Sequence, residues 1–187
     1  MQSLHLRTDT LLEIATFLVR RWSGKESVTV SISDQKEVQT KLRENKVSML
    51  SLEKYQGIDF QKYRQFRTAL WYESMRLRHS SKILSNDHAF GFILNTLETR
   101  RIEAIGRSLW QGMDSEIIFN YGVSWLYRPL LNTLYGNTRI VEGFAQYFLL
   151  GDIKGELSPS AFDKIKKASR AATEFVKDAV ENKYSTE

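Results

Sequence analysis

The stretch that decides the fold is 60–113, which contains FRTALWYESMRLRHSS at residues 66–81 and LNTLETRRIEAIGRSLWQGM at residues 94–113. Each half spaces its apolar residues three and four positions apart, as a helix with one buried face does. We therefore expect two consecutive helices that pack as neighbours. The expected buried positions are Tyr63, Phe66, Leu70, Trp71, Ser74 and Leu77 in the first helix, and Phe90, Ile93, Leu94, Leu97, Ala104, Ile105 and Leu109 in the second.

Charged residues interrupt these apolar faces. On a helix, residues three or four positions apart are neighbours, so Glu98 can pair with Arg101 and Glu103 with Arg107. A buried charge is costly unless it is paired, and arginine can satisfy several carboxylate oxygens at once. We therefore predict a structural ion network in which Arg101 lies between Glu98 and Glu73 of the first helix. Its members are Glu73, Arg76, Glu98, Arg101 and Glu103.

Two alternatives to this network stay open. The acids could bind a metal or another cation, although a neighbouring arginine would repel a metal ion. The remaining arginines could form a basic face for an acidic partner, although most runs of charge are simply solvated helix faces. The candidate partner-binding residues are Arg64, Arg67, Arg78, Arg100 and Arg107.

Two ordered blocks carry a family resemblance. Residues 69–81 follow the pattern ALxxExxRLRHxS, and residues 97–113 follow LExxRxEAxGxxxxxGM. Together they resemble the N-terminal region of CobT, a subunit of the aerobic cobaltochelatase, and related regions that precede a von Willebrand A domain. The matching residues are Ala69, Leu70, Arg76, Leu77, Arg78, His79, Leu97, Glu98, Arg101, Glu103, Ala104, Gly106, Gly112 and Met113.

This resemblance implies a scaffold or adaptor domain without catalytic residues or a cofactor. Its expected partner is a MoxR-type AAA+ ATPase or a von Willebrand A protein, with a role in metal insertion or cofactor maturation. The chain contains no D-x-S-x-S sequence, so the divalent-ion site of a von Willebrand A module is not expected here.

A zinc peptidase ancestry is the main rival interpretation. Residues 72–76 have the length of the zincin motif H-E-x-x-H, in which two histidines bind zinc and the glutamate acts as the base. Tyr72 and Arg76 stand at the two histidine positions, so we expect at most a degenerate zincin-like scaffold. His79 and His88 are the candidate metal ligands, with capping or surface positions as the alternative.

Composition narrows the class of protein. The 187 residues contain no cysteine, which excludes disulfides and thiolate metal sites. The N-terminal MQSLHLRTD lacks the features of a signal peptide, and no apolar run is long enough to cross a bilayer. We expect a cytoplasmic protein that does not enter the membrane. The formal charge of +5 allows nucleic-acid binding, the second alternative function, but the basic residues are dispersed.

The remaining segments complete an α+β prediction. We expect a mainly helical domain with a small β-hairpin: a helix and two strands within residues 1–59, the helix pair at 60–113 and further helices at 114–187. The two strands are expected at 28–33 and 47–52, and the polar segment between them as a short helix or a surface loop. Residues 114–135 are expected to form the most buried helix, divided at Pro129. Ser158 and Pro159 should open the last helix.

Overall fold

The computed structural model describes residues 6–81 and 88–183. The chain divides into two compact units, Met1–Ile83 and Leu84–Glu187. The division falls between the two helices of the expected pair, and both helices are present. The fold is mainly helical with a small mixed sheet, which confirms the α+β prediction. That the two units form one domain stays a prediction.

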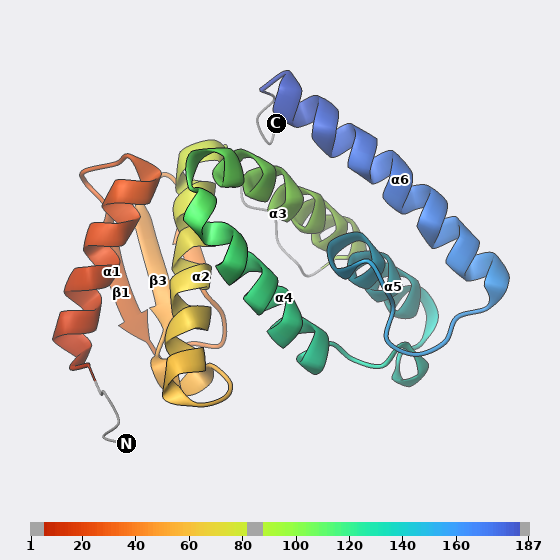
Figure 1. Ribbon diagram of the computed structural model, residues 1–187, viewed down its shortest axis with the longest axis horizontal. Helices are drawn as coiled ribbons and strands as arrows, with labels where there is room; N and C mark the ends of the chain where they lie inside the picture. The colour runs from red at the N-terminus through yellow and green to blue at the C-terminus, as the bar shows by residue number, and fades with distance from the viewer. Residues whose placement is uncertain (1–5, 82–87, 184–187) are drawn as a thin grey trace. The chain divides into compact units, whose positions relative to one another are not determined.

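The first unit combines two helices with a three-stranded sheet (Figure 1). Its elements are α1 (Thr8–Ser23), β1 (Thr29–Ser33), β2 (Gln39–Lys41), β3 (Lys46–Leu50), a short 3-10 helix η1 (Leu52–Lys54) and α2 (Asp59–His79). The helices pack against each other and against the sheet, and in Figure 1 the strands lie behind them. Helix α1 ends where Gly24 adopts a left-handed conformation, which glycine reaches without steric cost.

The sheet differs from the prediction of two strands. Strand β3 lies in the centre, parallel to β1 and antiparallel to β2. The hairpin is therefore β2–β3, with Val30 and Thr40 on either side of Val47. Three polar residues form β2, and they are held by backbone pairing at the sheet edge, so no alternation of apolar residues signals the strand.

The core of the first unit comes from one face of each element. Val30, Val47 and Met49 point inward from the sheet. They meet buried apolar side chains of α1 and α2, which are Leu11, Ala15, Val19, Trp22, Phe66, Leu70, Trp71, Met75 and Leu77. Burial of this much apolar surface is the main stabilising contribution. Ile14 has the helical spacing of the buried residues of α1, but it is exposed.

The second unit is helical in its described part. Its elements are α3 (Ala89–Leu109), the 3-10 helix η2 (Gln111–Met113), α4 (Asp114–Tyr127), the 3-10 helix η3 (Leu131–Thr133), α5 (Gly136–Leu150) and α6 (Pro159–Glu181). Pro129 separates α4 from η3, and Ser158 Oγ accepts a hydrogen bond from the Ala161 amide at 3.3 Å to cap α6. Both boundaries agree with the sequence signals.

The core of the second unit lies between α3, α5 and α6. Phe144 and Phe148 stack with their ring centroids 5.4 Å apart, and Ile165 and Val176 pack against the same cluster. Gly143 allows α5 to approach α6 closely, because a Cβ there would lie 3.0 Å from Ile165 Cδ1. These contacts set the position of α5, whose C-terminal end forms part of a charged cluster described below.

Two predictions about burial in this unit are wrong. Only Glu116 and Ile117 are buried in α4, so it is not the most buried helix. Phe90 and Leu109 of α3 are exposed, whereas the charged centre of α3 is buried. Apolar spacing alone cannot identify which face meets a neighbouring helix, because that depends on tertiary packing.

Candidate functional site

Glu73 of α2 is held by two groups within the first unit. Thr40 of β2 donates a hydrogen bond to Glu73 Oε2 at 2.6 Å, and Arg76 Nε lies 3.3 Å from Glu73 Oε1. Glu73 and Arg76, two members of the predicted network, therefore lie next to each other. These contacts join the edge strand to α2, so the carboxylate at the position of the zincin base stabilises the local structure.

Tyr55 lies close enough to Glu73 for the charge of the carboxylate to affect the pKa of its hydroxyl group. Its hydroxyl oxygen is buried and has no hydrogen-bond partner among the described residues, and its ring packs edge-on against Phe66. Burial, and secondly the negative charge of Glu73, raises the pKa of Tyr55 above its usual value. Both causes disfavour the phenolate, so Tyr55 is fixed as a neutral phenol.

Glu98 and Arg101 form a buried bidentate ion pair on α3. Arg101 Nε lies 2.7 Å from Glu98 Oε2, and Arg101 Nη2 lies 2.7 Å from Glu98 Oε1. Both residues are 6% exposed. Two parallel hydrogen bonds in a buried setting are the strongest arrangement for this pair. The pairing predicted from their spacing is confirmed, whereas the link from Arg101 to Glu73 stays a prediction.

Glu103 and Arg100 lie at the centre of a polar cluster that joins α3, α4 and α5 of the second unit. Arg100 Nη1 donates to Glu103 Oε2 and to the Tyr121 hydroxyl, both at 3.1 Å, and the Tyr121 hydroxyl donates to Glu103 Oε1. Arg100 Nη2 donates to the carbonyl oxygens of Phe148 at 3.1 Å and Leu149 at 2.5 Å. A cation therefore caps the carbonyl end of α5, where the helix dipole favours positive charge.

This cluster corrects one sequence prediction. Glu103 pairs with Arg100 and not with Arg107. The Nε atom of Arg107 lies 3.2 Å from Asp114 Oδ1 instead. Both arginines are within reach of Glu103 along the helix. Arg100 also donates to Tyr121 of α4 and to the last carbonyls of α5. These additional bonds favour the pairing of Glu103 with Arg100 over Arg107.

A cavity of about 510 Å³ adjoins this cluster. Its lining mixes apolar and charged side chains from α3, α5 and α6, which are Arg100, Glu103, Ala104, Arg107, Phe148, Thr173, Val176, Lys177, Val180 and Glu181. Arg100 and Arg107 both face carboxylates, so the charge of the cavity is largely compensated. The arrangement suits helix packing better than the recognition of a charged ligand.

A second polar network was not foreseen from the sequence. Arg128 Nη1 lies 3.0 Å from Glu142 Oε2, and Gln146 donates to the Pro129 carbonyl at 2.9 Å and to Glu142 Oε1 at 3.0 Å. The Lys154 amide donates to Gln146 Oε1 at 2.7 Å. These bonds tie both loops flanking α5 to the helix. A Glu and a Gln one turn apart within an apolar helix are the only sequence signal for the network.

The candidate partner-binding arginines are distributed over both units. Arg64, Arg67 and Arg78 belong to α2, whereas Arg100 and Arg107 belong to α3. Arg78 is exposed, and its Nη1 donates to the Trp22 carbonyl at 3.2 Å, which caps α1. A single partner face made of all five arginines stays a prediction.

The two candidate metal-ligating histidines also lie in different units. His79 is the last residue of α2, and His88 is the residue that precedes α3. Across 6–81 and 88–183, no group of three or more His, Asp or Glu residues is placed to hold a metal ion. Over the same ranges, no helix has both the length and the apolar character needed to cross a membrane.

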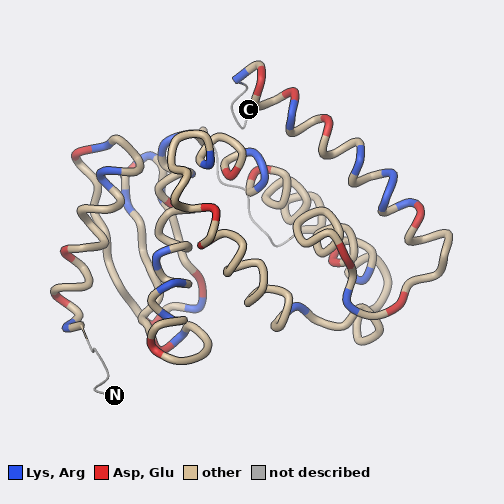
Figure 2. The backbone as a smooth tube through the Cα atoms, viewed as in Figure 1, with Lys and Arg blue, Asp and Glu red and all other residues tan. Residues whose placement is uncertain are grey.

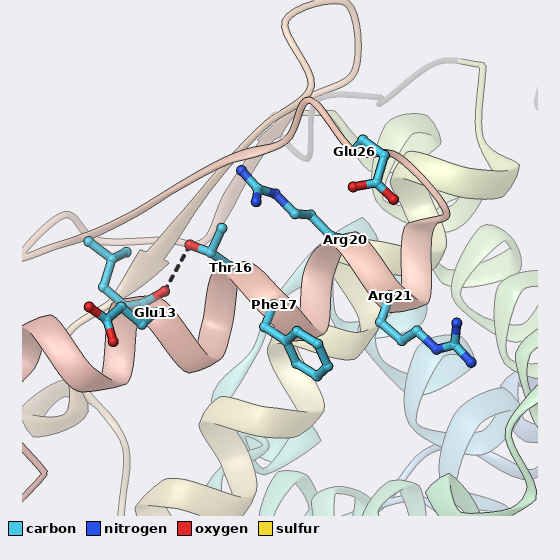
Figure 3. Close-up of a pocket in the computed structure, with 7 residues that line it drawn as sticks. Glu13, Thr16, Phe17, Arg20, Arg21 and Glu26 are labelled. Carbon is cyan, nitrogen blue, oxygen red and sulfur yellow. Dashed lines mark hydrogen bonds between the residues drawn. The ribbon is translucent and has the colours of Figure 1, made fainter.

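A hollow on the outer side of α1 was also missed from the sequence (Figure 3). It has a volume of about 610 Å³ and is lined by Leu12, Glu13, Thr16, Phe17, Arg20, Arg21 and Glu26. Phe17 is 68% exposed, because it lies off the buried face of the helix. A large apolar residue outside the buried spacing is the signal that sequence reading could have used.

Comparisons with protein-family models, with curated proteins and with solved structures found no match for this chain.

Proposed function

We propose that this chain is a non-catalytic scaffold or adaptor domain, similar to the N-terminal region of CobT. It acts in the cytoplasm with a chelatase-type MoxR AAA+ ATPase or a von Willebrand A protein, in metal insertion or cofactor maturation. The observation that supports the proposal is how the glutamates of the two CobT-like sequence blocks are paired. Glu73, Glu98 and Glu103 each face an arginine on their own helix.

These contacts favour a structural role for the motif residues. A general base must reach its substrate's proton, yet Glu73 accepts a hydrogen bond from Thr40 and lies against Arg76. Glu103 is 1% exposed and is held by Arg100 and Tyr121. Acids held in this way keep helices in register, which suits a domain that presents a rigid surface to a partner.

The adaptor function can be tested by photo-crosslinking the full chain in the cell of origin and identifying the captured proteins. Capture of an AAA+ ATPase or a von Willebrand A protein supports the proposal. Capture of nucleic acid alone, with binding that weakens steeply as salt rises, would instead favour the basic nucleic-acid-binding alternative.

The zincin-like alternative is tested by elemental analysis of the purified chain. We expect no stoichiometric zinc and no change in thermal stability after chelation, because Tyr72 and Arg76 occupy the positions of the two imidazoles. One tightly bound zinc per chain, lost together with stability on chelation, would overturn the adaptor proposal in favour of a metalloprotein.

A further inference from the structure

The positive charge of the protein is concentrated in the first unit. Residues 6–81 contain fourteen lysines and arginines against nine aspartates and glutamates, a formal charge of +5. Residues 88–183 contain twelve against eleven, a formal charge of +1. The first unit will therefore attract acidic partners more strongly than the second unit does.

Several of these cations gather at one end of the first unit. The C-terminal ends of α1 and α2 meet there, because Arg78 donates to the Trp22 carbonyl. The turn between β2 and β3 lies at the same end, where Lys25 Nζ donates to Asn45 Oδ1 at 2.9 Å. In Figure 2, blue segments, which mark lysine and arginine, lie at this end, at the top of the first unit. We name it the basic end, with Arg20, Arg21, Lys25, Arg43, Lys46 and Arg78 as its cations.

Phe17 stands beside this basic end. It precedes Arg20 and Arg21 by three and four residues, so the two arginines flank it on the helix surface. Figure 3 shows its ring directed away from the helix, with Arg21 beside it and Arg20 projecting on the other side. Neither arginine forms an ion pair with any described residue, so a partner's carboxylates need not displace an existing one.

We propose that this hollow, lined in part by Phe17, docks an acidic protein segment that carries an apolar side chain. The inference rests on the proposed adaptor function, since it names the surface and the chemistry of that partner. The apolar side chain packs on Phe17, while carboxylates of the same segment pair with Arg20 and Arg21. Aromatic residues and arginines are the residue types that dominate protein interfaces.

The hollow favours a protein segment over nucleic acid. Glu13 and Glu26 line the same hollow and would repel a phosphate backbone passing through it. Sequence-independent binding of single strands also uses several stacking aromatics, whereas Phe17 is the one aromatic residue of this lining. A protein segment can place uncharged residues opposite both glutamates and its carboxylates opposite Arg20 and Arg21, whereas a nucleic-acid backbone carries a charge at every phosphate.

The docking inference is tested with a displayed library of short random peptides, selected against the full chain. We expect enrichment of peptides that combine aspartate or glutamate with an aromatic or leucine residue. A synthetic peptide of the enriched sequence, followed by fluorescence anisotropy, should bind Phe17→Ala about tenfold more weakly. Arg20→Ala and Arg21→Ala should each weaken binding and make it less sensitive to salt.

Phe175→Ala is the matched control. Phe175 is 61% exposed on α6 and lies in the second unit, so its removal should leave peptide binding unchanged. Thermal melts of Phe17→Ala and Phe175→Ala should match the unmodified chain, because both side chains are exposed. Absence of an acidic consensus, or equal loss in both variants, would overturn the inference.

Further outcomes distinguish the docking surface from the adaptor function and from nucleic-acid binding. If crosslinking captures the ATPase or von Willebrand A partner equally with Phe17→Ala, the docking surface is wrong and the adaptor function stands. If peptide selection succeeds but no such partner is captured, the adaptor function is wrong and the surface stands. Binding of a mixed-sequence single-stranded oligonucleotide that is lost in Phe17→Ala, without peptide enrichment, would assign the surface to nucleic acid.

Discussion

Arg101 is a buried cation that pairs with the carboxylate of Glu98. Its guanidinium meets Glu98 through two bonds of 2.7 Å, and both residues are almost fully buried. We expect Arg101→Ala to lower the free energy of unfolding by about 3 kcal/mol, the scale for removing one member of a buried pair. Arg101→Met should also destabilise, because it keeps the volume but removes both hydrogen bonds from the guanidinium to Glu98.

Denaturant unfolding measures both changes. Arg170→Ala on the exposed side of α6 is the control, with an expected change within about 0.5 kcal/mol. If Arg101→Ala costs no more than this control, Glu98 and Arg101 do not form a stabilising buried pair.

Tyr55 gives the first unit a dependence on alkaline pH. Its pKa is raised in the folded protein by burial and by Glu73, so its contribution to stability is complete below the unfolded pKa of about 10. Stability should fall as pH rises above that value, because the unfolded chain loses the phenol proton more readily. Tyr55→Phe should reduce this fall, which denaturant unfolding at neutral and alkaline pH measures.

At neutral pH the same substitution should be nearly neutral. The Tyr55 hydroxyl is buried without a hydrogen-bond partner in the described structure, so replacing it with hydrogen removes no bond. We expect a change within about 1 kcal/mol, in either direction. An unchanged alkaline slope in Tyr55→Phe would show that other groups cause the loss of stability.

Helix α6 depends on its N-terminal cap. Ser158 Oγ accepts a hydrogen bond from the Ala161 amide, which otherwise lacks a partner within the helix. We expect Ser158→Ala to lower the free energy of unfolding by about 1 kcal/mol. Ser160→Ala, on an exposed residue of the first turn, should change it by less than about 0.5 kcal/mol. Equal effects in thermal or denaturant unfolding would argue against the cap.

Element boundaries with a local cause could be predicted from the sequence. Gly24, Pro129 and the Ser158-Pro159 pair act through backbone conformation and hydrogen bonding within a few residues. Strand β2 could not be predicted, because its three polar residues are ordered by the neighbouring strand. The exposure of α4 could not be predicted either, since it depends on which helices meet.

The candidate site divides in the same way. The pair Glu98 with Arg101 follows from helix geometry and is predicted from the sequence, and Glu73 with Arg76 has the same spacing. The choice of Arg100 over Arg107 by Glu103 depends on Tyr121 and on the end of α5, which belong to distant segments. Sequence spacing identifies the reachable partners, and tertiary structure selects among them.

At the scale of the whole molecule, Glu73 and Arg101 provide a test of the predicted network. They belong to different units, and the sequence predicts that Arg101 also faces Glu73. If so, the effects of Glu73→Ala and Arg101→Ala on the free energy of unfolding should be non-additive by at least about 0.5 kcal/mol. A double-mutant cycle by denaturant unfolding measures this coupling, and additive effects would show that the two residues act independently.

The order of the three strands also has a consequence for folding kinetics. Residues 42–45 alone separate β2 from β3, whereas residues 34–45, including β2, separate β1 from β3. Closing a shorter loop costs less entropy, so the β2–β3 hairpin should form before β1 joins the sheet. Val47→Ala in β3 should therefore slow refolding, whereas Val30→Ala in β1 should mainly speed unfolding, as stopped-flow measurements can determine. The central strand would then be the template on which the parallel edge strand is added.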